Sequence, residues 1–181
     1  MDIKVVNPIP QEDINFIINT FQFGLIPYEF KKIGHGFSAE VFRYKNYAIK
    51  VFEDEGFYDG EILENFQDNE LFPKLYFYNE DIMVTEHLNI VNAYQYFERN
   101  LQVPSADEIC KYCLDKGFLI GDIHDENVVV TLDEKLKIID VGAFKKTGCN
   151  LSLGQAVQAV YMDYIELGNI IEHIKRPPIA I

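Results

Sequence analysis

The chain has 181 residues, which suits one domain, or one domain built as two small lobes, and excludes a multidomain assembly. Hydrophobic residues make up 48% and charged residues 25%, so a disordered or low-complexity chain is excluded. The formal net charge of −13 would repel phosphate backbones and anionic membrane surfaces, and we therefore expect neither nucleic acid nor a membrane as a partner.

The compartment is predicted from apolar runs and from cysteine usage. No apolar run reaches the roughly 18 residues that span a bilayer, and the first residues lack the features of a signal peptide. Three cysteines are an odd count for a disulfide framework. We expect a cytoplasmic protein with reduced thiols.

The first part of the chain predicts one helix and two strand pairs. Apolar residues recur at the spacing of one helical face from Ile14 to Phe21, and Gly24 follows where that helix would end. The first strand pair turns at Lys45 and Asn46, and the second turns at residues 79–81. The predicted elements are a helix over 10–24, strands over 40–44, 47–52, 74–78 and 82–86, and a helix over 58–66.

Helical patterns dominate after residue 86. One predicted helix is capped by Ser105 and ended by Gly117. The predicted elements here are helices near 91–100, 105–116 and 153–174, and strands over 127–131 and 135–140. Strands first and helices second indicate an α+β fold. We divide it into an N-terminal helical extension (1–30), an N-terminal lobe (31–86) and a reduced C-terminal lobe (87–181).

A glycine loop and a strand lysine form the first candidate site. Gly34 and Gly36 lie between a predicted strand and the first hairpin, where glycine lets backbone amides approach a phosphate. Taken alone, this pair is more often an ordinary turn. Lys50 stands on the return strand of that hairpin, and a lysine beside such a loop would offset the repulsion between an acidic protein and a triphosphate.

Two acids and an asparagine form the second candidate site. Asp122 and Asn127 are five residues apart in a predicted loop, and Asp140 stands at the end of a later strand, before Gly142. Each residue taken separately is an ordinary turn or cap residue. Their order and spacing together indicate a shared site.

These residues resemble the protein kinase-like superfamily over residues 33–142, because a Gly-rich loop, a strand lysine, D-x-x-x-x-N and D-x-G follow in that family's order. The resemblance implies a two-lobed fold in which Lys50 holds the ATP phosphates. Asp122 would orient the attacking hydroxyl and accept its proton. Asn127 and Asp140 would bind Mg²⁺, which prefers hard oxygen ligands. The residues that the resemblance assigns to the nucleotide site are Gly34, Gly36, Val41, Ala48, Lys50, Glu86 and Leu88.

The family also implies a helix acid that pairs with Lys50. The apolar pattern of residues 58–66 favours Asp59 or Glu61 for that place. The strand that ends at Glu86 resembles the one that enters the hinge between lobes, and Met83 on it belongs to the core or lies near the adenine.

Several positions depart from the protein kinase pattern. Gly121 replaces the arginine before the catalytic aspartate, so regulation through a phosphorylated activation loop is not expected. His124 stands where serine/threonine kinases carry lysine, and G-D-x-H-x-x-N is similar to the loop of aminoglycoside, choline and lipopolysaccharide kinases. His124 either bonds the phosphates or stabilises the backbone of the loop. Only 41 residues follow Asp140, and RIO-type atypical kinases also shorten this region.

The remaining cysteine pair and histidines receive no catalytic role. Cys110 and Cys113 lie three apart on a predicted helix with no second ligand pair, so buried thiols are favoured over zinc. His35, His87 and His173 stand singly in the sequence.

We expect an ATP- and Mg²⁺-dependent kinase that phosphorylates a hydroxyl on a protein (serine or threonine) or on a small molecule. The first alternative is a nucleotide-binding pseudokinase that serves as an interaction module. The second is a different transfer chemistry, such as nucleotidylation.

Overall fold

The computed structural model describes residues 2–35, 39–53, 59–95, 101–148 and 151–175. The chain divides into two compact units. We call the first, Met1–Gln67 with Pro73–Leu88, the sheet unit, and the second, Asp68–Phe72 with Asn89–Ile181, the helical unit. The lobe boundary expected after residue 86 lies two residues before the division after Leu88.

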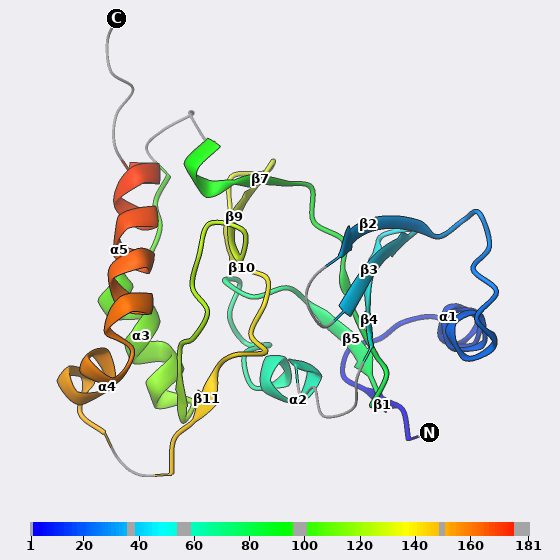
Figure 1. Ribbon diagram of the computed structural model, residues 1–181, viewed down its shortest axis with the longest axis horizontal. Helices are drawn as coiled ribbons and strands as arrows, with labels where there is room; N and C mark the ends of the chain where they lie inside the picture. The colour runs from blue at the N-terminus through cyan, green and yellow to red at the C-terminus, as the bar shows by residue number, and fades with distance from the viewer. Residues whose placement is uncertain (1, 36–38, 54–58, 96–100, 149–150, 176–181) are drawn as a thin grey trace, which may run out of the picture. The chain divides into compact units, whose positions relative to one another are not determined.

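The described part of the sheet unit contains one six-stranded antiparallel sheet (Figure 1). Its strands are β1 (Lys4–Val5), β2 (Lys31–His35), β3 (Ala39–Tyr44), β4 (Tyr47–Phe52), β5 (Leu75–Tyr78) and β6 (Ile82–Glu86), in the order β1-β5-β6-β4-β3-β2. The two predicted hairpins are confirmed. The turn between β3 and β4 places Lys45 at φ 51°, which closes a two-residue loop.

One face of the sheet packs against α1 (Gln11–Phe23). Strand residues of alternate register, such as Phe42, Ile49 and Val84, point to this face and meet Ile14 and Ile17 of the helix. The helix ends at Gly24, which adopts φ 67° as its C-cap. The predicted helix over 10–24 is confirmed.

The opposite face carries Val41, Lys50 and Met83, which are direct cross-strand partners on β3, β4 and β6. The short helix α2 (Asp59–Glu64) covers this face, on the side of the sheet away from α1 (Figure 1). A methyl group on Gly60 would lie 2.4 Å from the Tyr78 ring, so a glycine is needed where α2 meets β5. This packing brings the start of α2 to the lysine side of the sheet.

The helical unit contains three longer helices and two small sheets within its described residues (Figure 1). Its helices are η1 (Ala93–Gln95), α3 (Ala106–Asp115), α4 (Leu153–Ala159) and α5 (Tyr161–Lys175). Its strands are β7 (Ile90–Asn92), β8 (Phe118–Leu119), β9 (Val128–Thr131), β10 (Leu136–Ile138) and β11 (Lys145–Lys146). The mixed helix and sheet content agrees with the predicted α+β class.

The local signals of α3 are confirmed. Ser105 and Glu108 form a reciprocal capping box at its start, and Gly117 follows its end with φ 84°. The predicted strand pair over 127–131 and 135–140 is confirmed as β9 and β10.

Two helix predictions are wrong. The helix near 91–100 begins instead as β7, because Val91 pairs with Val130 and the β-branched side chains suit a sheet. The Asn92 side chain then accepts a hydrogen bond from the Tyr94 amide and starts the turn into η1, and residues 96–100 lie outside the described residues. The single helix over 153–174 is two helices, since Val160 leaves the helical conformation at φ −122° and ψ 38°.

No helix among the described residues is long and apolar enough to cross a membrane.

Candidate nucleotide and catalytic residues

Lys50 pairs with Asp59 inside the sheet unit. The Nζ of Lys50 lies 2.5 Å from Oδ2 of Asp59. The Lys50 side chain is 17% exposed and the Asp59 side chain 2% exposed. A buried carboxylate needs such a partner, and its fixed position at the start of α2 holds the ammonium in one place. Of the two acids that the sequence offered for this role, Glu61 is exposed, and Asp59 makes the pair.

Lys50 lies among residues that the family resemblance assigns to a nucleotide site. Val41 and Met83 flank Lys50 on the neighbouring strands, and Ala48 lies two residues away on the same face. Gly34 pairs with Val41, and a methyl group on it would meet the Val41 side chain at an ordinary 3.5 Å. Gly36 lies outside the described residues.

The end of β6 supplies the predicted hinge residues. The Glu86 amide donates to the Lys74 carbonyl at 2.8 Å, and its carboxylate accepts from the Lys74 amide at 2.9 Å, so Glu86 is anchored to the residue before β5. The His87 amide donates to Asn46 at 2.8 Å. Leu88 is the half-buried last residue of the sheet unit.

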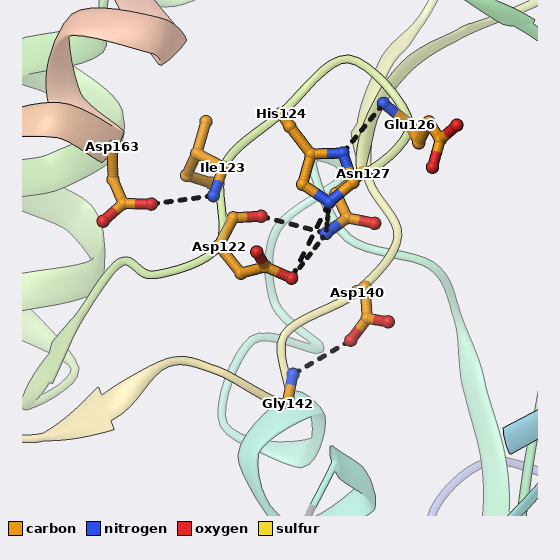
Figure 2. Close-up of polar contacts among 8 residues, drawn as sticks. All are labelled: Asp122, Ile123, His124, Glu126, Asn127, Asp140, Gly142 and Asp163. Carbon is orange, nitrogen blue, oxygen red and sulfur yellow. Dashed lines mark hydrogen bonds and ion pairs between the residues drawn. The ribbon is translucent and has the colours of Figure 1, made fainter. Parts of the chain in front are cut away.

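The loop between β8 and β9 gathers Asp122, His124 and Asn127 (Figure 2). Asp122 adopts φ 54°, a left-handed conformation that is uncommon for a residue other than glycine and is often found at functional sites. Its side chain is 64% exposed. Nδ2 of Asn127 donates to the Asp122 backbone oxygen at 2.9 Å and lies 3.3 Å from Asp122 Oδ2. The loop thus holds an exposed carboxylate beside a buried amide.

Gly121 is required by a close approach between two loops. A methyl group at this position would lie 2.4 Å from the backbone oxygen of Ala143, a distance that real structures do not show. Gly121 therefore lets the loop that carries Asp122 contact the segment after Asp140. The arginine that protein kinases place here would not fit this contact.

Asp140 follows β10 and begins a tight turn. Its Oδ1 accepts a hydrogen bond from the Gly142 amide at 3.1 Å (Figure 2). The next residue, Val141, is buried, and Phe144 packs against Phe72 with ring centroids 6.4 Å apart. The Ile139 amide donates to the Asn127 carbonyl at 2.9 Å. Backbone bonding thus joins the segment before Asp140 to the end of the Asp122 loop.

Asp163 is a positioning residue that the sequence reasoning missed. It lies in the first turn of α5, and its Oδ1 accepts a hydrogen bond from the Ile123 amide at 2.8 Å (Figure 2). A carboxylate is a strong acceptor for a backbone N–H, so this bond ties the residue after Asp122 to a helix. The sequence held no signal for it, because Asp163 falls in the middle of the predicted helix over 153–174 and comes to a helix start only through the division at Val160.

The prediction of buried thiols is confirmed for Cys110 and Cys113, and the absence of a role for the single histidines stays a prediction. Cys110 and Cys113 are free and buried in α3, as expected, and Cys149 lies outside the described residues. Burial raises the pKa of Cys110 to about 11 and that of Cys113 to about 12. His35, which received no role, has Nδ1 within 4.0 Å of carboxylate oxygens of Glu40 and Glu53. His35 and Glu53 are exposed, and the half-buried Glu40 already pairs with Lys32.

Comparison with known proteins gives a structural match only. A scan against protein-family models and a search of curated proteins find no match. Among solved structures, the Lpg2603 kinase of Legionella pneumophila bound to IP6 is similar, with a TM-score of 0.51 and 18% sequence identity. The match covers 81% of this chain and 60% of the Legionella chain, so this chain spans about three fifths of that protein's length. The similarity shows a kinase-like fold.

Proposed function

We propose that the protein is an ATP- and Mg²⁺-dependent phosphotransferase that moves the γ-phosphate to a hydroxyl group. The observation that carries the proposal is the loop in which an exposed Asp122 carboxylate is held beside Asn127. The kinase-like fold supports it. The similarity of the Gly121–Asp122 loop to that of aminoglycoside, choline and lipopolysaccharide kinases stays a prediction. So does the likeness of the short region after Asp140 to that of RIO-type atypical kinases.

Each residue has a role that fits its surroundings. Lys50, held by buried Asp59, would neutralise the α- and β-phosphates. Asp122 is exposed enough to meet an incoming hydroxyl, orient it and accept its proton. Positioning and charge neutralisation account for most of the catalysis in phosphoryl transfer.

The residues present fit a magnesium ion. Mg²⁺ prefers oxygen ligands and takes few from the protein, leaving the rest of its shell to phosphates and water. The amide oxygen of Asn127 is turned away from the groups that bond its nitrogen (Figure 2), and Asp140 adds a carboxylate. These two side chains would hold the ion, which supplies neutralising charge for the phosphates when bound.

The acceptor is either a protein serine or threonine or a small molecule. His124 in place of the lysine of serine/threonine kinases, together with the short chain after Asp140, favours a small or atypical substrate over an extended peptide. IP6 belongs among the candidate ligands, because the similar Legionella kinase was solved bound to it.

The test is transfer of labelled γ-phosphate from Mg-ATP by the purified protein. It is run alone, with fractionated cell extract, and with IP6, and the products are identified by mass spectrometry. We expect a gain of phosphate on one product class, and loss of transfer in Lys50→Met. A gain of AMP would replace the proposal with nucleotidylation. ATP binding with no transfer in any arm would favour the pseudokinase.

A further inference from the structure

Three polar atoms lie within hydrogen-bond distance of the side-chain nitrogen of Asn127. Nδ2 lies 2.9 Å from the Asp122 backbone oxygen, 3.3 Å from Asp122 Oδ2, and 2.8 Å from Nε2 of His124 (Figure 2). An amide nitrogen carries two hydrogens, and these contacts use both. Asp122 decides which end of the Asn127 amide carries the nitrogen. A reversed amide would place its oxygen against the backbone oxygen and Oδ2 of Asp122.

These contacts favour one tautomer of a neutral His124 ring. A neutral imidazole has one nitrogen that accepts and one that donates. The Glu126 amide lies 3.3 Å from Nδ1, and the Asn127 amide lies 2.8 Å from Nε2, so two donors compete for one acceptor. The shorter contact takes the lone pair. On this ground we assign the acceptor role to Nε2, which faces Asn127, and the proton to Nδ1, which leaves the longer contact from the Glu126 amide without an acceptor.

We propose that His124 is a positioning residue that holds the Asn127 amide with its oxygen outward, ready for a metal ion. This role rests on the proposed function, in which Asn127 binds Mg²⁺. The contact with Asn127 favours a role in stabilising the loop over a role in binding the phosphates, because the His124 ring bonds a side chain of its own loop. Asp122 provides a second hold on the same amide, so loss of His124 weakens metal binding without abolishing it.

Two substitutions at one position separate hydrogen bonding from shape. His124→Leu introduces an apolar side chain of similar size and removes the hydrogen-bond acceptor. His124→Gln carries an amide oxygen that reaches about as far as Nε2 and restores the acceptor. The His124 side chain is 38% exposed, so neither change creates a large buried cavity, and circular dichroism checks the fold of each variant.

The first measurement needs neither metal nor substrate. Nitrogen-15 NMR of the wild-type ring at neutral pH reports which nitrogen carries the proton. We expect the Nδ1–H form, and we expect the Asn127 side-chain amide signals to move in His124→Leu and to stay near their wild-type positions in His124→Gln. An Nε2–H ring would overturn the proposal.

The second measurement is the affinity for Mn²⁺ in the presence of a non-hydrolysable ATP analogue. Electron paramagnetic resonance reports the fraction of Mn²⁺ that is bound. Outer-shell partners of metal ligands typically contribute about 10–100-fold in affinity, and we expect a loss of that size in His124→Leu with recovery in His124→Gln. Equal affinities in all three proteins, or equal losses in both variants, would overturn the role of His124. A wild-type protein that binds no Mn²⁺ with the nucleotide would instead overturn the proposed function, and the metal role with it.

Discussion

Gly121 has no side chain of its own, yet its identity decides whether the Asp122 loop and the segment after Asp140 can touch. In Gly121→Ala the new methyl group would meet a backbone oxygen at 2.4 Å, and a backbone atom cannot move aside as a flexible side chain can. We expect a free energy of unfolding lower by about 1–3 kcal/mol, as for other overpacked sites, and a large loss of phosphate transfer. Urea denaturation and the transfer assay measure the two effects.

The matched control for that change is Gly154→Ala in α4, where an added methyl group meets nothing within 4 Å. Alanine favours a helix over glycine by about 1 kcal/mol, so this variant should be at least as stable as the wild type. If Gly121→Ala were equally stable, the close approach to Ala143 would not exist in solution.

Asp163 holds the residue after Asp122 by accepting a hydrogen bond from the Ile123 amide. Asp163→Asn keeps an oxygen acceptor for the Ile123 amide but removes its charge, and Asp163→Ala removes the acceptor. Because the bond holds the residue after Asp122, we expect kcat to fall in Asp163→Ala, with Asp163→Asn between it and the wild type and KM for ATP little changed. An effect on KM alone would contradict the positioning role.

The grouping of the candidate residues was predictable from the sequence where short spacing carries the information. Asp122, Asn127 and Asp140 follow one another at short range, and the acid that pairs with Lys50 was narrowed to two candidates on one predicted helix. Asp163 was not predictable, since it bonds a residue 40 positions away and nothing local distinguishes it from any other acid within the predicted helix over 153–174. The same holds for the contact between Gly121 and Ala143, which depends on how two loops fold together.

At the scale of elements, Asp13 attaches α1 to the hairpin of β3 and β4. Its buried carboxylate lies 2.5 Å from Lys45 Nζ and accepts hydrogen bonds from the hydroxyls of Tyr47 at 3.1 Å and Tyr44 at 3.4 Å. Asp13→Ala leaves the tyrosine hydroxyls without this acceptor, and we expect the free energy of unfolding to fall by about 1–3 kcal/mol. Chemical denaturation measures it.

The same variant has a spectroscopic signature. Burial first, and the bond to Asp13 second, raise the pKa of Tyr47 from 10.0 to about 12. Removing the carboxylate removes an acceptor that favours the protonated phenol, so the pKa of Tyr47 should fall in Asp13→Ala. Glu12→Ala, an exposed acid in the same helical turn, should change neither the pKa nor the stability. Equal behaviour of the two variants would contradict the attachment.

The two buried cysteines of α3 should react slowly with an alkylating reagent as long as the helix stays folded. A raised thiol pKa means less thiolate, which is the form that reacts. With a pKa of about 11 in place of 9.0, Cys110 should react about 100-fold more slowly with iodoacetamide at pH 8, and buried Cys113 more slowly still. Mass spectrometry of the labelled peptides, with and without urea, checks this. Rapid labelling without urea would mean that α3 opens in the native protein.

Elements were predictable where local signals begin and end them, and less so elsewhere. The Ser105 cap and Gly117 bound α3, and short polar turns mark the hairpins. The strand β7 was missed because its pairing partner Val130 lies far along the chain, and tertiary pairing overrode the local helical pattern. The division of the last helix at Val160 has no glycine or proline to announce it.

At the scale of the whole molecule, the candidate residues are divided between the two units. The sheet unit carries Lys50 with its partner Asp59, and the helical unit carries Asp122, Asn127 and Asp140. The net charge of −13 makes the lysine and the metal ion essential to the proposal, because the protein as a whole repels a triphosphate. The order of these residues along the chain predicts a kinase-like fold, and the structural comparison supports that prediction.

The measurement that tests the central claim most directly is the initial rate of γ-phosphate transfer by Asp122→Asn. Loss of a general base typically costs about 10²–10⁴-fold, and we predict a fall of that size in kcat. Asp125→Asn is the matched control, because it removes the same charge from the same loop at a carboxylate that bonds Asn92 at 2.9 Å. A rate for Asp122→Asn equal to that of the wild type would contradict the account.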